Sequence, residues 1–179
     1  LNDVSKDAKG KGIYVADMGA TQYMRDETNA LWPVDSEQAM SIPHVGRIYH
    51  IDLQGKITIA EDTSSLLLNP NGVGIDKAGN FMVGEFFRGN LLVNRDGKLT
   101  PLKGQFRGAD AVEQDSKGNY YISSWELGTV WKIDGTTEAS TILIEGLESA
   151  ADFYLEEDKG RLLLPDMKAG KVYSVDINQ

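Results

Sequence analysis

The chain has 179 residues, of which 41% are hydrophobic and 25% are charged, and it contains no cysteine. A chain of this length and composition can form one domain with a hydrophobic core, whereas the lack of cysteine excludes disulfides and thiolate metal sites. The 27 acidic and 18 basic residues give a formal net charge of −9, which argues against binding to nucleic acid or to anionic membranes.

A unit of about 40 residues occurs four times along the chain, and each copy begins with a short polar side chain. These first residues are Asn2, Asn71, Asp110 and Asp152. An acidic residue follows five positions later, at Asp7, Asp76, Asp115 and Glu157. A glycine follows after three more positions, at Gly10, Gly79, Gly118 and Gly160. Because Asp and Gly are typical of tight turns, each unit is expected to contain a turn at the same place.

Runs of β-branched, aromatic and other apolar residues follow these turns and predict the strands. In chain order, the strands after the turns cover 13–15, 81–83, 120–122 and 162–164. The next strands cover 46–52, 89–93, 128–134 and 170–176, and three units add a fourth strand at 57–59, 99–102 and 140–144. Four antiparallel strands per repeat of about 40 residues are typical of a β-propeller blade. The prediction is therefore an all-β fold, a β-propeller. The alternative is a β-sandwich, although sandwich strands do not usually repeat the same residue types in register.

One propeller domain of about four blades is expected over residues 1–179. The sequence begins at Leu1 within the repeat pattern, and its last unit ends after a third strand near Asp176. We therefore expect the C-terminal part of a six-bladed ring, which at this repeat length needs roughly 240–280 residues. A self-contained four-bladed ring is the alternative. The open strand edges of an incomplete ring favour self-association or pairing with the missing N-terminal part.

The link between the second and third strands of the first unit is much longer than in the other units. It forms an inserted loop over residues 20–45, and it includes apolar residues such as Tyr23, Leu31 and Trp32. Long loops without secondary structure of their own are usually functional or disordered, and this one is too apolar for simple disorder. It emerges at the face that carries the first residues of the units, where it can act as a lid over the central mouth. Packing on a neighbouring blade or on a partner subunit is the alternative.

The four first residues are the main candidates for a functional site. In a propeller the first strands line the central channel, so these residues are expected to surround its mouth. They supply amide and carboxylate oxygens, which suit Ca²⁺ and other hard divalent cations, whereas zinc would require His or Cys. We therefore predict that Asn71, Asp110 and Asp152 bind Ca²⁺ or another divalent cation. The alternative is a repeated structural corner, in which each side chain bonds to backbone amides of its turn.

Four residues are candidates for binding a substrate at this mouth. Asn2 belongs to the ring of first residues, whereas Arg88 and Trp125 lie in short links between strands on the same face. His44 ends the inserted loop and can face the mouth, although a single histidine is more often a bystander. The alternative role for Trp125 is packing between blades. His50 lies within a strand and is expected to be structural.

Several short motifs together resemble the senescence-marker-protein and gluconolactonase family, which is related to the paraoxonases. They are Asn2-Asp-Val, the long insertion, Gly46-Arg-Ile-Tyr, Pro70-Asn-Gly-Val and Ala109-Asp-Ala. The resemblance covers nearly the whole chain, and the fourth unit is similar to a bacterial subgroup whose members are often exported. It implies a six-bladed propeller with a calcium-like ion in the central channel and hydrolysis of sugar lactones or related esters. It also favours a periplasmic or secreted location over the cytoplasm.

The resemblance implies roles for individual residues. Asn71 matches a metal-binding asparagine, and Asp110 matches an aspartate that binds the metal and acts as general base. Asn2 matches an asparagine that contacts substrate, and the insertion matches part of a substrate lid. The family's metal-binding glutamate lies in a first blade that this chain does not contain, so the metal site within these residues is expected to be incomplete.

The sequence therefore favours a metal-dependent hydrolase whose partner is a small-molecule lactone or ester. Asp110 is the candidate that activates water, while a divalent cation would polarise the carbonyl group. The alternative is a non-catalytic propeller that binds a small molecule or a protein, because propellers host many functions. Metal content distinguishes the two hypotheses, since a binding protein needs no metal.

Overall fold

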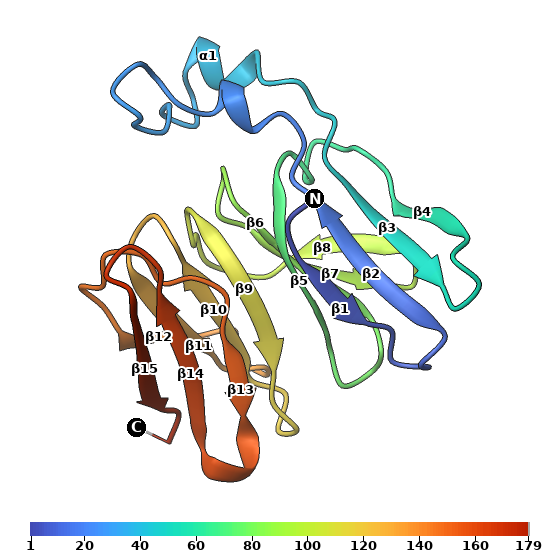
Figure 1. The fold of residues 1–179 in the computed structure, drawn as a ribbon, viewed down its shortest axis with the longest axis vertical. Coiled ribbons are helices and arrows are strands. Elements are labelled where there is room, and N and C mark those ends of the chain that lie inside the picture. Colours follow the sequence, from blue (N-terminus) through green and yellow to red (C-terminus); the bar gives the residue numbers. More distant parts are fainter. Residues whose placement is uncertain (179) are drawn as a thin grey trace.

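The computed structural model describes residues 1–178 and contains four antiparallel sheets that are arranged as the blades of a propeller (Figure 1). Blade 1 consists of β1 (Val4–Lys6), β2 (Gly12–Asp17), β3 (Arg47–Asp52) and β4 (Ile57–Glu61). Blade 2 consists of β5 (Pro70–Ile75), β6 (Phe81–Glu85), β7 (Leu91–Arg95) and β8 (Lys98–Pro101). Blade 3 consists of β9 (Ala109–Gln114), β10 (Tyr120–Ser124), β11 (Thr129–Ile133) and β12 (Ser140–Ile144). Blade 4 consists of β13 (Tyr154–Glu156), β14 (Arg161–Asp166) and β15 (Lys171–Asp176). In every blade the strands lie side by side in sequence order, which confirms the predicted all-β propeller.

The repeated acidic residue and glycine of each unit form the turn between the first two strands of a blade. In blade 2, Asp76 Oδ1 accepts hydrogen bonds from the backbone N–H groups of Ala78 and Asn80 at 2.9 and 2.8 Å. Gly79 in the same turn has a φ of 88°, a backbone conformation that favours glycine. Asp115 caps the corresponding turn of blade 3. These contacts explain why the same two residue types recur in register.

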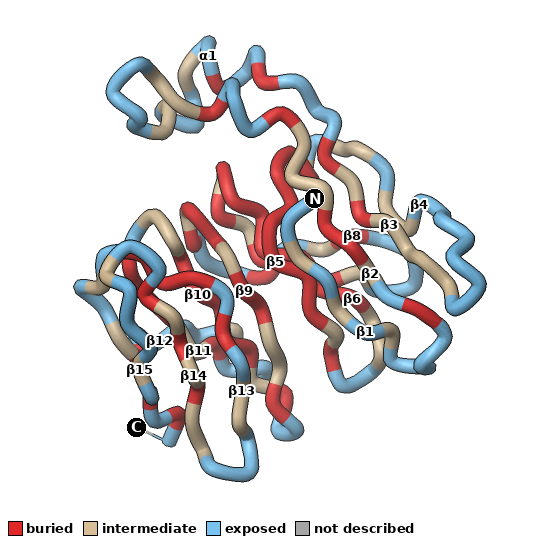
Figure 2. The backbone as a smooth tube through the Cα atoms, viewed as in Figure 1, coloured by how far each residue is buried: buried red, intermediate tan, exposed pale blue. Residues whose placement is uncertain are grey.

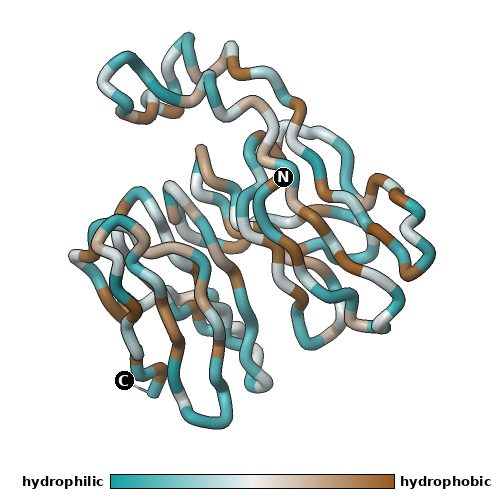
Figure 3. The backbone as a smooth tube through the Cα atoms, viewed as in Figure 1, coloured by the Kyte–Doolittle hydropathy of each residue, from teal (hydrophilic) through white to brown (hydrophobic). Residues whose placement is uncertain are grey.

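Burial is most complete along β5, β6 and β10 (Figure 2). Buried apolar side chains fill the spaces between successive blades. The junction of blades 1 and 2 contains Ala16, Ile48, Val73 and Val83. The junction of blades 2 and 3 contains Met82, Leu91, Ala109 and Ile122. The junction of blades 3 and 4 contains Tyr121, Leu162, Leu164 and Val175. Hydrophobic segments lie in the strands, and hydrophilic residues lie in many of the turns (Figure 3). The core is therefore shared between blades, and each blade is stabilised by its neighbours.

Blades 2 and 3 approach each other closely at their inner strands, β5 and β9. A Cβ atom on Gly72 would overlap the backbone carbonyl oxygen of Asp110, so only glycine fits at this separation. The neighbouring Asn71 donates a hydrogen bond from Nδ2 to the carbonyl oxygen of Ala109 at 2.9 Å. These contacts fix the first residues of two successive units relative to each other.

Both inner strands of this junction also contain a β-bulge at the first residue of their unit. The register of β5 against β6 shifts between Pro70 and Gly72, which leaves Asn71 as an extra residue. A corresponding shift in β9 lies next to Asp110. Bulges of this kind bend a strand and re-aim its side chains, and they are common beside active sites.

The polar residue at the end of the second strand of a unit forms hydrogen bonds with the backbone of the segment that precedes the first strand of the same blade. Glu85 of β6 is fully buried. Its carboxylate accepts hydrogen bonds from the backbone N–H groups of Asn69, Phe87 and Arg88 at 3.1, 3.2 and 2.8 Å. Burial raises the pKa of Glu85 to about 7, although these hydrogen bonds oppose the increase. Asp166 occupies the same position in blade 4 and accepts comparable backbone bonds.

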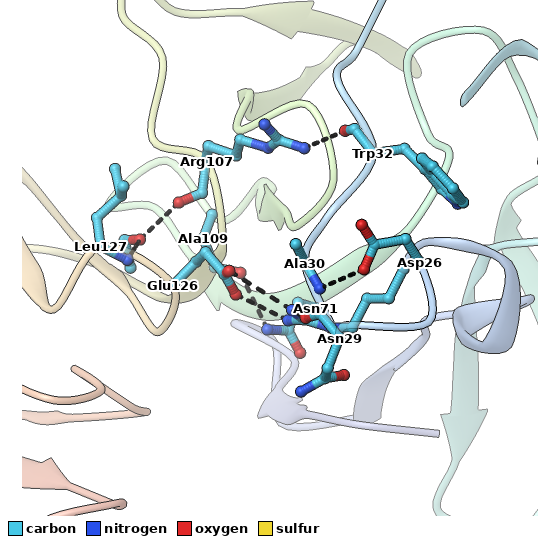
Figure 4. Close-up of polar contacts among 11 residues, drawn as sticks. Asp26, Asn29, Ala30, Trp32, Asn71, Arg107, Ala109, Glu126 and Leu127 are labelled. Atoms are coloured by element: carbon cyan, nitrogen blue, oxygen red, sulfur yellow. Dashed lines mark hydrogen bonds and ion pairs between the residues drawn. The ribbon is translucent and has the colours of Figure 1, made fainter. Parts of the chain in front are cut away.

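The insertion, residues 20–45, lies over one end of the blades (Figure 1) and contains the short helices η1 (Thr21–Tyr23) and α1 (Glu37–Met40). Its buried side chains pack against the entry and the β6–β7 link of blade 2, in a cluster of Met24, Ala39, Ile42, Leu68, Phe86 and Phe87. Arg107, which precedes β9, donates from Nη2 to the carbonyl oxygen of Trp32 in the insertion (Figure 4). The insertion is therefore a packed part of the fold. Across residues 1–178, no helix has the length and apolar character needed to span a bilayer.

Candidate functional site

A cavity of about 300 Å³ opens between the insertion and the beginnings of the inner strands, and we call it the mouth cavity. Its polar lining consists of Asn2, Arg25, Asn71 and Asp110. Its apolar lining consists of Met18, Phe86, Trp125 and Met167. All four blades and the insertion contribute to it, so side chains that are far apart in the sequence converge on one small volume.

Asn2, Asn71 and Asp110 form a chain of side-chain contacts in the mouth cavity, and we call this chain the floor. Asn71 Nδ2 donates to Asp110 Oδ1 at 2.8 Å. The same Nδ2 atom donates to the carbonyl oxygen of Ala109 (Figure 4). Asn2 Nδ2 donates to Asn71 Oδ1. The first residues of three units therefore meet at one point, where an amide N–H group donates from Asn2 to Asn71 and another from Asn71 to Asp110.

The carboxyl group of Asp110 is electrostatically strained. Burial raises its pKa to about 7, repulsion from Asp152 and Asp3 acts in the same direction, and the hydrogen bond from Asn71 opposes the increase. No lysine, arginine or histidine within residues 1–178 forms an ion pair with Asp110. A carboxyl group with a pKa near neutrality can accept and release a proton at physiological pH.

A second cavity of about 410 Å³ continues along the inner strands, and we call it the channel cavity. Three acidic residues line it: Asp3, Glu113 and Asp152. Burial raises the pKa of Glu113 to about 7, with repulsion from Asp152 and Asp3 as further causes. Burial likewise raises the pKa of Asp3 to about 6, although the backbone N–H of Val73 donates to it at 2.7 Å and opposes the increase. The centre of the propeller therefore concentrates negative charge that protein cations do not offset in the described part of the chain.

The insertion contributes Arg25 to the mouth cavity. Arg25 Nη2 forms an ion pair with Glu126 Oε2 of the β10–β11 link at 2.7 Å. Its Cζ atom lies 5.9 Å from the ring centre of Phe86 and 5.8 Å from that of Trp125. At these distances a cation is attracted to an aromatic ring. Arg25 thus connects the insertion to blades 2 and 3 while it faces the cavity.

The structure places three of the predicted site residues outside the lining of the mouth cavity. Arg88 donates from Nη1 to the carbonyl oxygen of Ser65. His44 is exposed, and its own carbonyl oxygen accepts a hydrogen bond from Thr63 Oγ1 at 2.6 Å. Asp152 lines the channel cavity instead, although it is close enough to Asp110 to raise the pKa of that residue. The structure brings together the other predicted residues, Asn2, Asn71, Asp110 and Trp125.

Two residues of this region, Arg25 and Glu113, were not predicted from the sequence. Arg25 lies in an insertion that has no counterpart in the other units, so the repeat alignment carries no information about it. Glu113 is three positions after Asp110, and regular alternation would place these residues on opposite faces of a strand. The bulge in β9 changes this register. The available signal was the carboxylate of Glu113 itself, because a carboxylate in an inner strand requires a partner or a function.

Comparison with known proteins found no match to a protein-family model and none to a curated protein. Among solved structures, the fold is similar to that of a gluconolactonase from Xanthomonas campestris, with 18% sequence identity and a TM-score of 0.62 over 98% of this chain and 56% of that one. A second structure described as a gluconolactonase has 16% identity and a TM-score of 0.63 over 99% of this chain and 58% of that one. A structure of the nidogen–laminin complex has 14% identity and a TM-score of 0.66 over 91% of this chain and 55% of that one.

These similarities establish the β-propeller fold, and at such low identity they establish the fold alone. The chain spans little more than half the length of each of these three structures. Proteins described as gluconolactonases are among its neighbours in fold.

Proposed function

We propose that this propeller carries a gluconolactonase-like active site that hydrolyses lactones or related esters with the help of a divalent cation. The observation that carries the proposal is the meeting of Asn2, Asn71 and Asp110 on the floor of a cavity with aromatic and apolar walls. A mostly apolar cavity with a few convergent polar groups and a carboxyl of shifted pKa is the usual form of a small-molecule site. The gluconolactonases among the fold neighbours support the same class of reaction.

The chemistry of the polar groups fits a hard divalent cation such as Ca²⁺. Asn71 offers an amide oxygen and Asp110 offers carboxylate oxygens, and Asp152 adds negative charge nearby. In this structure Asn71 Nδ2 faces Asp110 and Asn71 Oδ1 accepts from Asn2, so binding of a cation requires the Asn71 amide to turn its oxygen toward Asp110. No three His, Asp or Glu side chains among residues 1–178 are grouped closely enough to hold a metal ion by themselves, so the amide of Asn71 is an essential part of the proposed ligand set. A bound cation would polarise the substrate carbonyl and stabilise the negative charge that develops on its oxygen.

The residues of the mouth cavity have separate roles in this proposal. Asp110 accepts a proton from the attacking water. Asn2 orients the substrate through its amide group, which already reaches the centre of the floor. Phe86 and Trp125 contact the apolar face of the substrate. The insertion acts as a lid, because it contributes Arg25 to the cavity and limits the access of bulk water.

A non-catalytic binding protein is the second candidate, and the similarity to a chain of the nidogen–laminin complex favours it. Such a protein would use the same cavity or the outer surfaces of the blades without turning over a ligand. It would not need a divalent cation, so metal content and hydrolysis together distinguish the two candidates.

We also propose that further blades or another chain cover the end faces of blades 1 and 4. Leu1, Val4 and Ile57 at blade 1 and Tyr154 and Val172 on blade 4 are exposed apolar side chains. Leu1 and Ile57 line one shared apolar pocket, and contiguous exposed apolar surface is typical of interaction surfaces. Size-exclusion chromatography with light scattering on residues 1–179 is expected to show association, and a monodisperse monomer would contradict this part of the proposal.

The test of the function is the variant Asp110→Ala. Its control is Glu145→Gln, which removes an exposed carboxylate that lines neither the mouth cavity nor the channel cavity. We expect Asp110→Ala to abolish divalent-cation binding and lactone hydrolysis without unfolding the protein. Calorimetric titration with Ca²⁺, a lactone assay and circular dichroism measure the three properties. Glu145→Gln is expected to behave like the unchanged protein. Hydrolysis that persists in Asp110→Ala would rule out the proposed role of this residue.

A further inference from the structure

The wall and the floor of the mouth cavity carry opposite charges. Asp110 lies on the floor, and Asp3, Glu113 and Asp152 line the channel cavity next to it. Arg25 is the one cationic side chain among the described residues that line the mouth cavity. A second cation, Lys168, lies beside the lining residue Trp125, with its Nζ 3.9 Å from the ring centre. A ligand with a single anionic group is therefore favoured with this group toward Arg25 and Trp125 and away from the acidic centre.

Arg25 is held in position on several sides. Its Nη1 donates to the carbonyl oxygen of Asn29 at 2.8 Å, and its Nη2 pairs with Glu126 at 2.7 Å. The rings of Phe86 and Trp125 lie within 6 Å of the guanidinium. Because a guanidinium has five N–H donors, these contacts leave donors for a further acceptor. A guanidinium that is already ordered loses little freedom when it binds a carboxylate.

We propose that the mouth cavity selects small molecules that carry a carboxylate on an apolar ring, and that Arg25 is the residue that binds this carboxylate. Phe86 and Trp125 contact the ring, and the end of the molecule opposite to the carboxylate faces Asp110. For the hydrolysis proposed above, this names the substrate class as lactones or esters that bear a carboxylate. The assignment of a reaction rests on the proposed function, whereas the binding preference does not.

Glu126 makes this inference testable because it competes with the ligand for the same guanidinium. Glu126→Gln keeps the shape of the side chain but removes its charge, so Arg25 becomes more available to a ligand carboxylate. Arg25→Gln removes the cation itself. If Arg25 only held the insertion in place, both substitutions would break the same ion pair and would change ligand binding in the same direction. Recognition of a carboxylate predicts changes of opposite sign.

The experiment compares the binding of cyclopentanecarboxylate and of cyclopentanecarboxamide, two rings of equal size that cannot be hydrolysed as lactones. Titrations followed by NMR are expected to show that the unchanged protein binds the carboxylate about tenfold more tightly, a difference of the size that one charge-assisted pair supplies. Glu126→Gln is expected to increase this preference, Arg25→Lys to keep part of it and Arg25→Gln to remove it. Equal binding of the two probes, binding of neither, or a loss of preference in both Glu126→Gln and Arg25→Gln would overturn the inference.

A parallel assay of hydrolysis separates this inference from the proposed function. The two substrates are γ-butyrolactone and the same lactone with a carboxylate on its ring. A carboxylate preference in binding without hydrolysis of either lactone would support the inference and contradict the proposed function. Hydrolysis of both lactones at equal rates, with a ratio that Arg25→Gln does not change, would support the function and contradict the inference. Circular dichroism of each variant confirms that the fold is intact.

Discussion

Asp110 and Asp115 belong to the same repeat unit and lie five residues apart, yet their surroundings differ in every respect that matters for function. Asp115 accepts hydrogen bonds from the backbone and side chain of Asn119 at 2.8 Å and from the Tyr121 hydroxyl at 3.0 Å. Partial burial opposes these bonds, but they outweigh it and lower the pKa of Asp115. At Asp110, burial and carboxylate repulsion outweigh the single side-chain bond from Asn71 and raise the pKa to about 7.

The difference shows that a repeated carboxylate is structural where local partners satisfy it and available for chemistry where they do not. The partners of Asp115 are within six residues, so the turn sequence alone supplies them. The neighbours of Asp110 come from other blades, and they include the like charges of Asp3 and Asp152. Such an arrangement costs stability, which is expected of a site that binds a cation or transfers a proton.

The largest expected effect breaks the junction that positions Asp110. Gly72→Ala places a methyl group on the carbonyl oxygen of Asp110, and we expect a loss of about 3 kcal/mol or more in the free energy of unfolding. Gly84→Ala is the matched control, because its nearest neighbour would be at an ordinary 3.4 Å. Urea denaturation measures both variants. An equal loss in the two would show that the close approach of β5 and β9 is not required.

The next effect concerns the turn carboxylate. Asp115→Ala leaves the buried Tyr121 hydroxyl and the Asn119 amide without their acceptor, so it is expected to lower the free energy of unfolding by about 2 kcal/mol. Asp110→Ala is expected to cost much less at neutral pH, because it also removes repulsion. Thermal and urea unfolding of both variants at the same pH give the comparison. A larger loss in Asp110→Ala than in Asp115→Ala would reverse the assignment of structural and chemical roles.

The effect of pH on the free energy of unfolding is expected to have opposite signs for the buried carboxyl groups of the site and for the turn carboxylate Asp115. The folded pKa of Asp110 and of Glu113 lies above the ordinary values of 3.8 and 4.5. The stabilisation that these two groups give to the folded state is therefore full at acidic pH and is lost as the pH rises through about 7. The lowered pKa of Asp115 gives the opposite dependence, with a contribution that is lost below its ordinary value. Metal-free protein is thus expected to lose several kcal/mol of unfolding free energy between pH 5 and pH 8, because each of the two groups contributes about 1.4 kcal/mol per pH unit below its folded pKa. A rise in stability over this range would contradict the account.

The smallest expected change in the free energy of unfolding comes from a substitution in the channel cavity. Glu113→Gln removes one buried charge beside Asp3 and Asp152, so metal-free protein is expected to gain about 1 kcal/mol at pH 8. At pH 5 the side chain is already protonated, and the gain is expected to vanish. Urea unfolding at the two pH values measures the difference. A gain of equal size at both would assign the effect to packing.

The fold could be predicted from the sequence because its information is local. Each unit repeats an acidic residue and a glycine at a turn, and Asp76 and Gly79 show how they act within a few residues of each other. The sequence also predicted that Asn71 and Asp110 lie together on the floor of the mouth cavity, since they occupy equivalent positions of successive units. The position of Arg25 could not be predicted, because it depends on how the insertion packs on blade 2. The orientation of Glu113 depends on a bulge that no residue pattern marks.

The most direct test of the central claim is the effect of Ca²⁺ on thermal unfolding at pH 8, measured on the unchanged protein and on Asp110→Asn. The carboxylates around Asp110 are charged at this pH, so cation binding to the folded state is expected to stabilise the unchanged protein by about 2.7 kcal/mol at a hundred times the Kd. Asp110→Asn is expected to gain little. An unchanged midpoint in the presence of Ca²⁺, or an equal increase in Asp110→Asn, would contradict a cation site at Asp110.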